Sequence, residues 1–131
     1  MARGEVFPII NCDDLQTTKA FYKQVFGAEQ SYEFVHEGQE VYVTLDVGGG
    51  KVALGLGTGP AMYGETPLPA SGHAVDLCVY TPDLEAAVAA APAAGGRVVV
   101  EPQDMPWGER VAYLQDPAGT MVLTIQDEPP R

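Results

Sequence analysis

Apolar and polar positions divide the chain into two halves with the same layout. In the first half, the apolar run VFPIINC has the length of a strand and ends at Asp13-Asp14. The next segment, LQTTKAFYKQVFG, repeats apolar residues at helical spacing and ends at Gly27, which suits a helix C-cap. Strand-like segments follow at 30–36, 40–46 and 51–56, separated by glycine-containing turns.

The second half repeats this order. A strand is predicted over 75–80, and a helix runs from Asp83 to the Gly95-Gly96 pair with Pro92 in its last turn. Strands are predicted over 97–101, 110–115 and 121–126, and an Asp-Pro-Ala-Gly turn joins the last two.

A shift of 69 residues superimposes the halves without gaps and pairs Asp14 with Asp83 and Leu54 with Leu123. The pattern therefore predicts an α+β fold built from two βαβββ modules within a single domain over 1–131. The first module covers 4–57, a Gly- and Pro-rich linker covers 58–72, and the second module covers 73–128.

Charge and composition restrict the partners. Eighteen acidic residues against seven basic ones give a net charge of −11, so nucleic acid is not expected, because a phosphate backbone needs a basic face. The same charge favours cationic small molecules, or it serves solubility alone. No apolar run approaches the roughly 20 residues of a membrane helix, and the first residues lack a signal-peptide core. We expect a cytoplasmic protein without a membrane partner, with Cys12 and Cys78 as buried free thiols.

Three segments in this order and spacing resemble the vicinal oxygen chelate superfamily, which includes glyoxalase I, extradiol dioxygenases, fosfomycin-resistance enzymes and bleomycin-resistance proteins. They are DDLQTTKAFYKQVFG, PDLEAAVAAAPAAGG and WGERVAYLQDPAGTMVLTI. The resemblance covers nearly the whole chain and implies mixed sheets that curl around a cavity. It also implies a homodimer, often with exchanged modules, although one chain of this length could close a cavity by itself. The fold alone does not fix the activity, because this scaffold hosts several chemistries.

In enzymes of the superfamily, the resemblance implies a divalent metal held by the first and last strand of each module. The corresponding positions here are Phe7, Leu54, Asp76 and Leu123. Only Asp76 can bind a cation, whereas a catalytic zinc site needs three protein ligands. We therefore expect no metal cofactor. If the protein does bind a metal, the expected ligands are His73 and Asp76, and Glu101 or Glu109 could complete the set.

Apolar and aromatic residues are instead expected around the cavity, where flat rings stack on planar ligands and attract cations. The expected ligand-binding residues are Phe7, Asn11, Phe34, Tyr42, Leu54, Met62, Tyr63, Asp76, Trp107 and Leu123. Tyr32 is an alternative to Phe34, and Glu109 is expected to pair with Arg110 at the rim. For the apolar residues, the alternative role is plain packing in the core. For Trp107, the alternative role is a lid that packs on its own module.

The sequence thus favours a non-catalytic protein that binds and sequesters a planar, cationic, antibiotic-like small molecule, close in character to the bleomycin-resistance branch. The alternative is a metal-dependent enzyme of the same superfamily, either a glyoxalase-like lyase or isomerase or a dioxygenase. A third possibility is an interaction module without a pocket.

Overall fold

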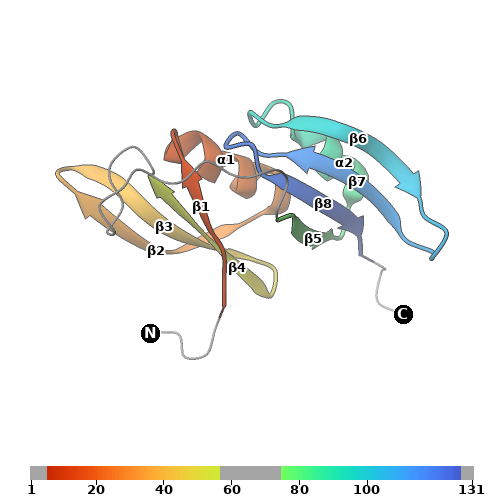
Figure 1. The fold of residues 1–131 in the computed structure, drawn as a ribbon, viewed down its shortest axis with the longest axis horizontal. Helices are drawn as coiled ribbons and strands as arrows, with labels where there is room; N and C mark the ends of the chain where they lie inside the picture. The colour runs from red at the N-terminus through yellow and green to blue at the C-terminus, as the bar shows by residue number, and fades with distance from the viewer. Residues whose placement is uncertain (1–5, 57–74, 128–131) are drawn as a thin grey trace.

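The computed structural model describes residues 6–56 and 75–127, which form two modules of one helix and four strands each (Figure 1). The first module contains β1 (Ile9–Cys12), α1 (Leu15–Phe26), β2 (Glu29–His36), β3 (Gln39–Val47) and β4 (Gly50–Leu56). The second contains β5 (Leu77–Thr81), α2 (Leu84–Ala90), β6 (Arg97–Asp104), β7 (Arg110–Gln115) and β8 (Met121–Gln126). The predicted linker lies outside the described residues.

Both modules build the same mixed sheet. The strand orders are β1-β4-β3-β2 and β5-β8-β7-β6. In each sheet the strand before the helix pairs in parallel with the last strand, and the remaining pairs are antiparallel. Figure 1 shows the two sheets side by side along the longest axis of the molecule. The predicted α+β fold of two similar modules is therefore confirmed.

Aspartate caps begin both helices. The Asp14 carboxylate accepts the backbone N–H of Thr17 at 3.1 Å, and Asp83 accepts that of Ala86 at the same distance. Gly27 ends α1 in the left-handed conformation, with φ 68°, as the sequence predicted.

The second helix is shorter than expected. Regular helix α2 stops at Ala90, and a series of turns continues to Gly95. Pro92 has no backbone N–H to donate to the preceding turn, and its ring clashes with the carbonyl four residues earlier. The prediction of a helix that runs to Gly95-Gly96 is therefore wrong by about one turn.

One apolar core joins the two modules. Phe21 and Tyr22 of α1 are fully buried and belong to the same cluster as Ala87 of α2 and Leu114 of β7. Helix α1 also contacts α2 directly. None of the helices in the described residues is long and apolar enough to cross a membrane.

Candidate functional site

Each sheet has one face packed on the helices and an opposite face turned away from them, which we call its open face. In β5, Leu77 and Val79 pack against the core, while Cys78, Tyr80 and the preceding Asp76 are exposed, as the alternation of side chains along a strand requires. Paired residues of neighbouring strands share a face. The open face of the second sheet therefore comprises Asp76, Cys78, Tyr80, Val111, Tyr113, Leu123 and Ile125.

Two tyrosines reach across the apolar strand β8 on this open face. Tyr80 of β5 donates its hydroxyl to Glu109, next to β7, at 3.1 Å. In the reverse direction, Tyr113 of β7 donates to Asp76, next to β5, at 2.9 Å. Leu123 and Ile125 lie on the strand between them. Leu123 is half-buried and Ile125 is buried, so the result is a largely covered apolar floor crossed by two tyrosine–carboxylate hydrogen bonds.

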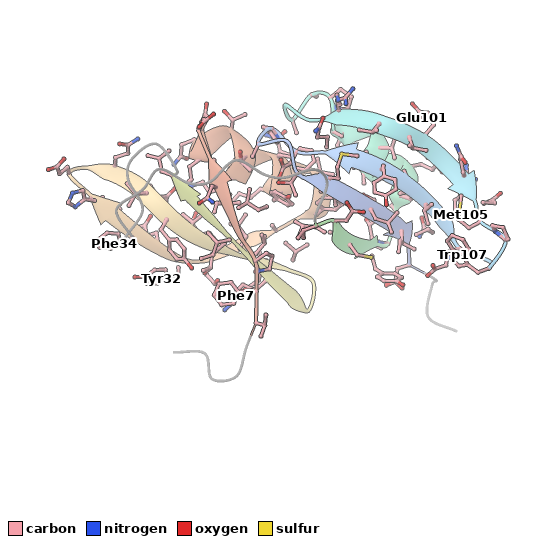
Figure 2. All side chains as sticks on the ribbon, in the orientation of Figure 1. Phe7, Tyr32, Phe34, Glu101, Met105 and Trp107 are labelled. Carbon is pink, nitrogen blue, oxygen red and sulfur yellow. The ribbon has the colours of Figure 1, made fainter. Side chains whose placement is uncertain are left out.

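Trp107 stands at the end of this face, in the turn between β6 and β7 (Figure 2). The turn closes through a hydrogen bond from the Met105 N–H to the Glu109 carbonyl at 2.8 Å, and Gly108 takes φ 100°, which favours glycine. The Trp107 indole N–H donates to Glu109 Oε1 at 2.8 Å, although the side chain is 67% exposed. Glu109 thus accepts a hydrogen bond at each oxygen, from Trp107 and from Tyr80.

These contacts keep the titratable donors neutral. The hydrogen bond to Glu109 raises the pKa of Tyr80, and the bond to Asp76 raises the pKa of Tyr113. Partial desolvation of the sulfur, followed by the charge of Glu109, raises the pKa of the Cys78 thiol, so it is not an activated nucleophile. Cys12 is buried as predicted, but Cys78 is exposed, because it lies on the open face of an edge strand.

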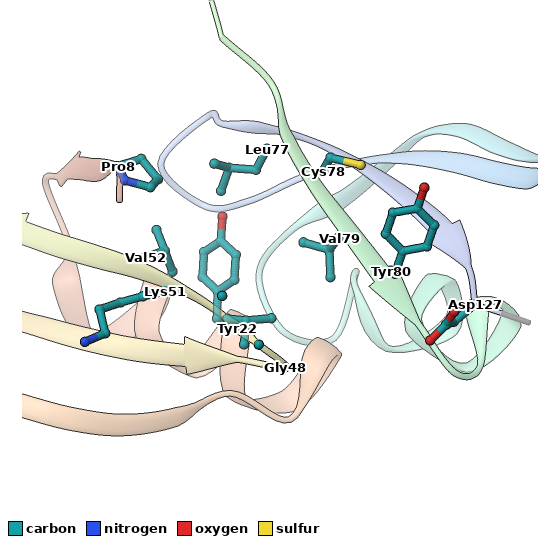
Figure 3. Close-up of a pocket in the computed structure, with 13 residues that line it drawn as sticks. Pro8, Tyr22, Gly48, Lys51, Val52, Leu77, Cys78, Val79, Tyr80 and Asp127 are labelled. Carbon is teal, nitrogen blue, oxygen red and sulfur yellow. The ribbon is translucent and has the colours of Figure 1, made fainter. Parts of the chain in front are cut away.

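A cavity of about 480 Å³ lies where the two sheets meet (Figure 3). The β3–β4 turn and Lys51 border it on one side and β5 on the other, and Tyr22 of α1 forms part of its wall. Cys78 and Tyr80, which belong to the open face of the second sheet, line the cavity together with Leu77 and Val79 of the opposite face. The volume falls within the range of small-molecule pockets.

The first sheet carries a second row of predicted residues. Asn11 pairs with Gly55, Gly55 with Tyr42, and Tyr42 with Phe34, so the three side chains share its open face. Tyr32 lies next to Tyr42, with ring centroids 6.0 Å apart. Phe7, half-buried just before β1, has the Lys51 ammonium 5.6 Å from its ring centroid.

The predicted ligand-binding residues therefore form two groups. Asp76, Leu123 and Trp107 lie on the second sheet or its turn, and Phe34 lies on the first (Figure 2). Figure 2 shows Phe34 and Trp107 at opposite ends of the molecule, so one chain does not bring them into one cavity. Met62, Tyr63 and His73 lie outside the described residues. That the described ones bind a ligand stays a prediction.

Leu54 does not line the open face as expected. It pairs with Ile10 and is fully buried among the core side chains under α1. Ile10 corresponds to Val79, which pairs with Thr124, so the counterpart of Leu54 is Thr124, not Leu123. The turn between β3 and β4 has two unpaired residues, whereas the turn between β7 and β8 has five. A single shift of 69 residues therefore cannot align every element of the two modules. A shift of one residue moves a side chain to the other face.

The predicted rim pair of Glu109 and Arg110 is also wrong. Neighbouring residues of a strand point to opposite faces, and Arg110 instead binds Glu85 of α2 and Asp104, both at 3.0 Å. Sequence reasoning missed Tyr80 and Tyr113 as parts of the site. For Tyr80 the signal was present, because it shares strand parity with Asp76.

The described residues do not fit a metal centre. Of the four expected ligand positions, Phe7 and Leu123 hold apolar side chains toward the open faces, and Leu54 is buried. Asp76 alone offers a carboxylate. Within residues 6–56 and 75–127, no three His, Cys, Asp or Glu side chains gather closely enough to hold an ion. Glu101 lies on the outer strand β6, and Glu109 accepts from Trp107 and Tyr80.

Comparison with known proteins agrees with this fold. At 34% identity over 110 residues, the chain matches "Putative glyoxylase CFP32" of Mycobacterium bovis, covering 84% of this chain and 39% of that protein. It thus spans about two-fifths of that relative's length.

Two solved structures also share the fold. TioX from Micromonospora sp. ML1 has a TM-score of 0.71 at 24% identity, covering 95% of this chain and 98% of TioX. A glyoxalase-related enzyme from Fulvimarina pelagi has a TM-score of 0.76 at 16% identity, covering 95% and 89% of the two chains. The profile of one family matches residues 6–123. The chain belongs to the glyoxalase/bleomycin resistance protein/dioxygenase superfamily.

Proposed function

We propose that this protein binds and sequesters a planar, cationic, antibiotic-like small molecule without changing it. The ligand occupies the open face of the second sheet and the cavity that Cys78 and Tyr80 also line. The observation that carries this proposal is the apolar floor of Leu123 and Ile125, crossed by two tyrosine–carboxylate bonds and bordered by Trp107. Apolar surface with a few fixed polar groups is the usual composition of a small-molecule site.

The shape and the charge of the ligand follow from the same side chains. Tyr80 and Trp107 are 55% and 67% exposed as residues, and flat exposed rings stack on planar molecules. The net charge of −11 favours the approach of a cation over that of an anion. The hydrogen-bonded tyrosines are neutral and the Cys78 thiol is protonated, so neither supplies a nucleophile.

We further propose that the protein works as a homodimer. Large apolar side chains stand exposed on the open faces of both sheets, and patches of this kind mark interaction surfaces. A second copy facing the second sheet with its own first sheet would bring Phe34 and Tyr42 opposite Trp107. That arrangement would unite the two groups of predicted residues in one pocket.

Calorimetric titration with a panel of planar aromatic cations tests the binding function. Trp107→Ala should weaken a bound cation by about 1–3 kcal/mol, or roughly 5- to 150-fold, the range for aromatic stacking. The control is Val99→Ala, a half-exposed position on the outer strand β6, which should leave affinity unchanged. Equal losses in both variants, or no binding across the panel, would contradict the proposal.

Mass spectrometry of the bound molecule separates this proposal from the enzyme alternative. We expect recovery of an unaltered ligand, with or without added zinc, nickel, manganese or iron. Turnover that needs one of these metals and is lost in Asp76→Ala would establish the enzyme instead. Elemental analysis of protein purified without chelator gives an independent answer.

A further inference from the structure

We propose that Glu109, held between Trp107 and Tyr80, is the group that recognises the positive charge of the ligand. This subsite accepts an organic cation with a delocalised or alkylated nitrogen. The inference rests on the proposed function, because it identifies which part of that site selects for charge.

The carboxylate of Glu109 is fixed but not neutralised. The Trp107 indole N–H holds Oε1 at 2.8 Å and the Tyr80 hydroxyl holds Oε2 at 3.1 Å. Both donors are uncharged, so the full negative charge of Glu109 remains. Each carboxylate oxygen has about two acceptor positions, and each can therefore accept a further hydrogen bond or face a cation.

The cations of the same module are engaged elsewhere. Arg97 and Arg110 are the basic residues within 75–127. Arg97 binds the side chain of Gln115 at 2.8 Å, and Arg110 binds Glu85 and Asp104. Neither guanidinium pairs with Glu109, so the described part of the second module leaves its charge for a ligand.

The two rings make the subsite selective for an organic cation. A flat cation stacked on the Trp107 or Tyr80 ring would bring its charge close to Glu109, because both residues are mostly exposed and both donate to that carboxylate. Aromatic faces attract weakly hydrated organic cations, whereas a small inorganic ion keeps its water. Tyr80 also lines the cavity between the sheets, so the uncharged part of the ligand can continue into it.

Calorimetric titration with 1-methylquinolinium and with quinoline tests this subsite. The two molecules have nearly the same flat shape, and in slightly alkaline buffer only the first is charged. The native protein should prefer the cation by about fivefold or more, the factor expected from opposite unit charges about 4 Å apart in water. The preference should shrink as salt is added.

Two matched variants assign the preference. Glu109→Gln removes the charge but keeps an oxygen for the Trp107 or Tyr80 donor, so the preference should disappear while quinoline binds as before. Glu85→Gln also removes one negative charge, but on α2, where Glu85 pairs with Arg110. This variant should still prefer 1-methylquinolinium over quinoline. Circular dichroism and thermal melting verify that both variants are folded.

The outcomes separate the two proposals. Equal binding of both molecules by the native protein, or a preference that survives Glu109→Gln, would overturn the assignment of Glu109 and leave the planar-ligand site standing. Binding of neither molecule would contradict both proposals.

Discussion

Tyr22 and Asp116 form a buried hydrogen bond that joins the two modules. The Tyr22 hydroxyl, on α1, donates to Asp116 Oδ2 at 2.7 Å, in the turn between β7 and β8. The other carboxylate oxygen accepts the backbone N–H groups of Ala118 at 2.9 Å and Thr120 at 2.8 Å. Tyr22 is fully buried and Asp116 is 3% exposed. Removal of the hydroxyl would leave Oδ2 buried with no replacement donor from these groups.

Tyr22→Phe keeps the ring in the core and deletes only this donor. A buried hydrogen bond to a charged group contributes about 1.5–3 kcal/mol, so we expect a loss of that size in the free energy of unfolding. For a chain of this length, 1 kcal/mol corresponds to about 3–5 °C in melting temperature. The expected decrease is therefore about 5–15 °C.

Thermal and urea unfolding followed by circular dichroism measure this loss. The control is Tyr80→Phe, which deletes a hydroxyl bonded to a carboxylate at the surface and should cost less than about 1 kcal/mol. Equal stability of Tyr22→Phe and the native protein would refute the reasoning. So would a loss as large in Tyr80→Phe as in Tyr22→Phe.

The same pair sets the response to alkaline pH. Burial, followed by the negative charge of Asp116 and the hydrogen bond to it, raises the pKa of Tyr22 far above its usual range. A raised folded-state pKa stabilises the fold below the ordinary value of about 10, and this stabilisation is lost as pH rises further. Tyr22→Phe should therefore lose less stability above that pH than the native protein does.

Two further predictions concern stability. Burial opposes ionisation of Glu40, but hydrogen bonds outweigh it and lower the pKa of Glu40 to about 2, and the hydrogen bond from Lys19 has the largest effect among them. Glu40→Gln should therefore be less stable than the native protein at neutral pH. The difference in melting temperature should shrink as pH falls from the ordinary value near 4.5 through about 2, and a constant difference would contradict this. A Cβ at Gly96 would collide with the Phe21 ring and lie 2.6 Å from the Gln115 carbonyl oxygen, so Gly96→Ala should cost about 1–3 kcal/mol in urea unfolding. Gly49→Ala, where a Cβ meets no atom within 4 Å, is its control, and equal losses would refute the clash.

Local signals predicted most of the fold. The carboxylates of Asp14 and Asp83 accept backbone N–H groups at the starts of the helices, and Gly27 ends α1 because glycine readily adopts the left-handed conformation. The alternation along β5 places Leu77 and Val79 on the helix side and Cys78 and Tyr80 on the open face, because side-chain direction in a strand depends only on position. The order of elements followed from the same short-range patterns.

The site depended on relations between distant segments. The bonds from Tyr80 to Glu109 and from Tyr113 to Asp76 span 29 and 37 residues and exist only because β8 lies between β5 and β7 in one register. The misplacement of Leu54 had the same origin, since pairing with Ile10, not repeat spacing, sets its face. Register is decided by turn lengths and by which face is buried, and neither is visible in one repeat offset.

Trp107 is the only tryptophan in the chain, so its indole N–H gives a single, assignable signal in a proton–nitrogen correlation spectrum. Titration of labelled protein with 1-methylquinolinium follows that signal together with the backbone amides of Tyr80, Glu109 and Ile125. A planar-ligand site on the open face of the second sheet predicts saturable shifts of all four signals with one dissociation constant. An indole signal that stays fixed while the ligand binds elsewhere, or no saturable shift at all, would contradict the account.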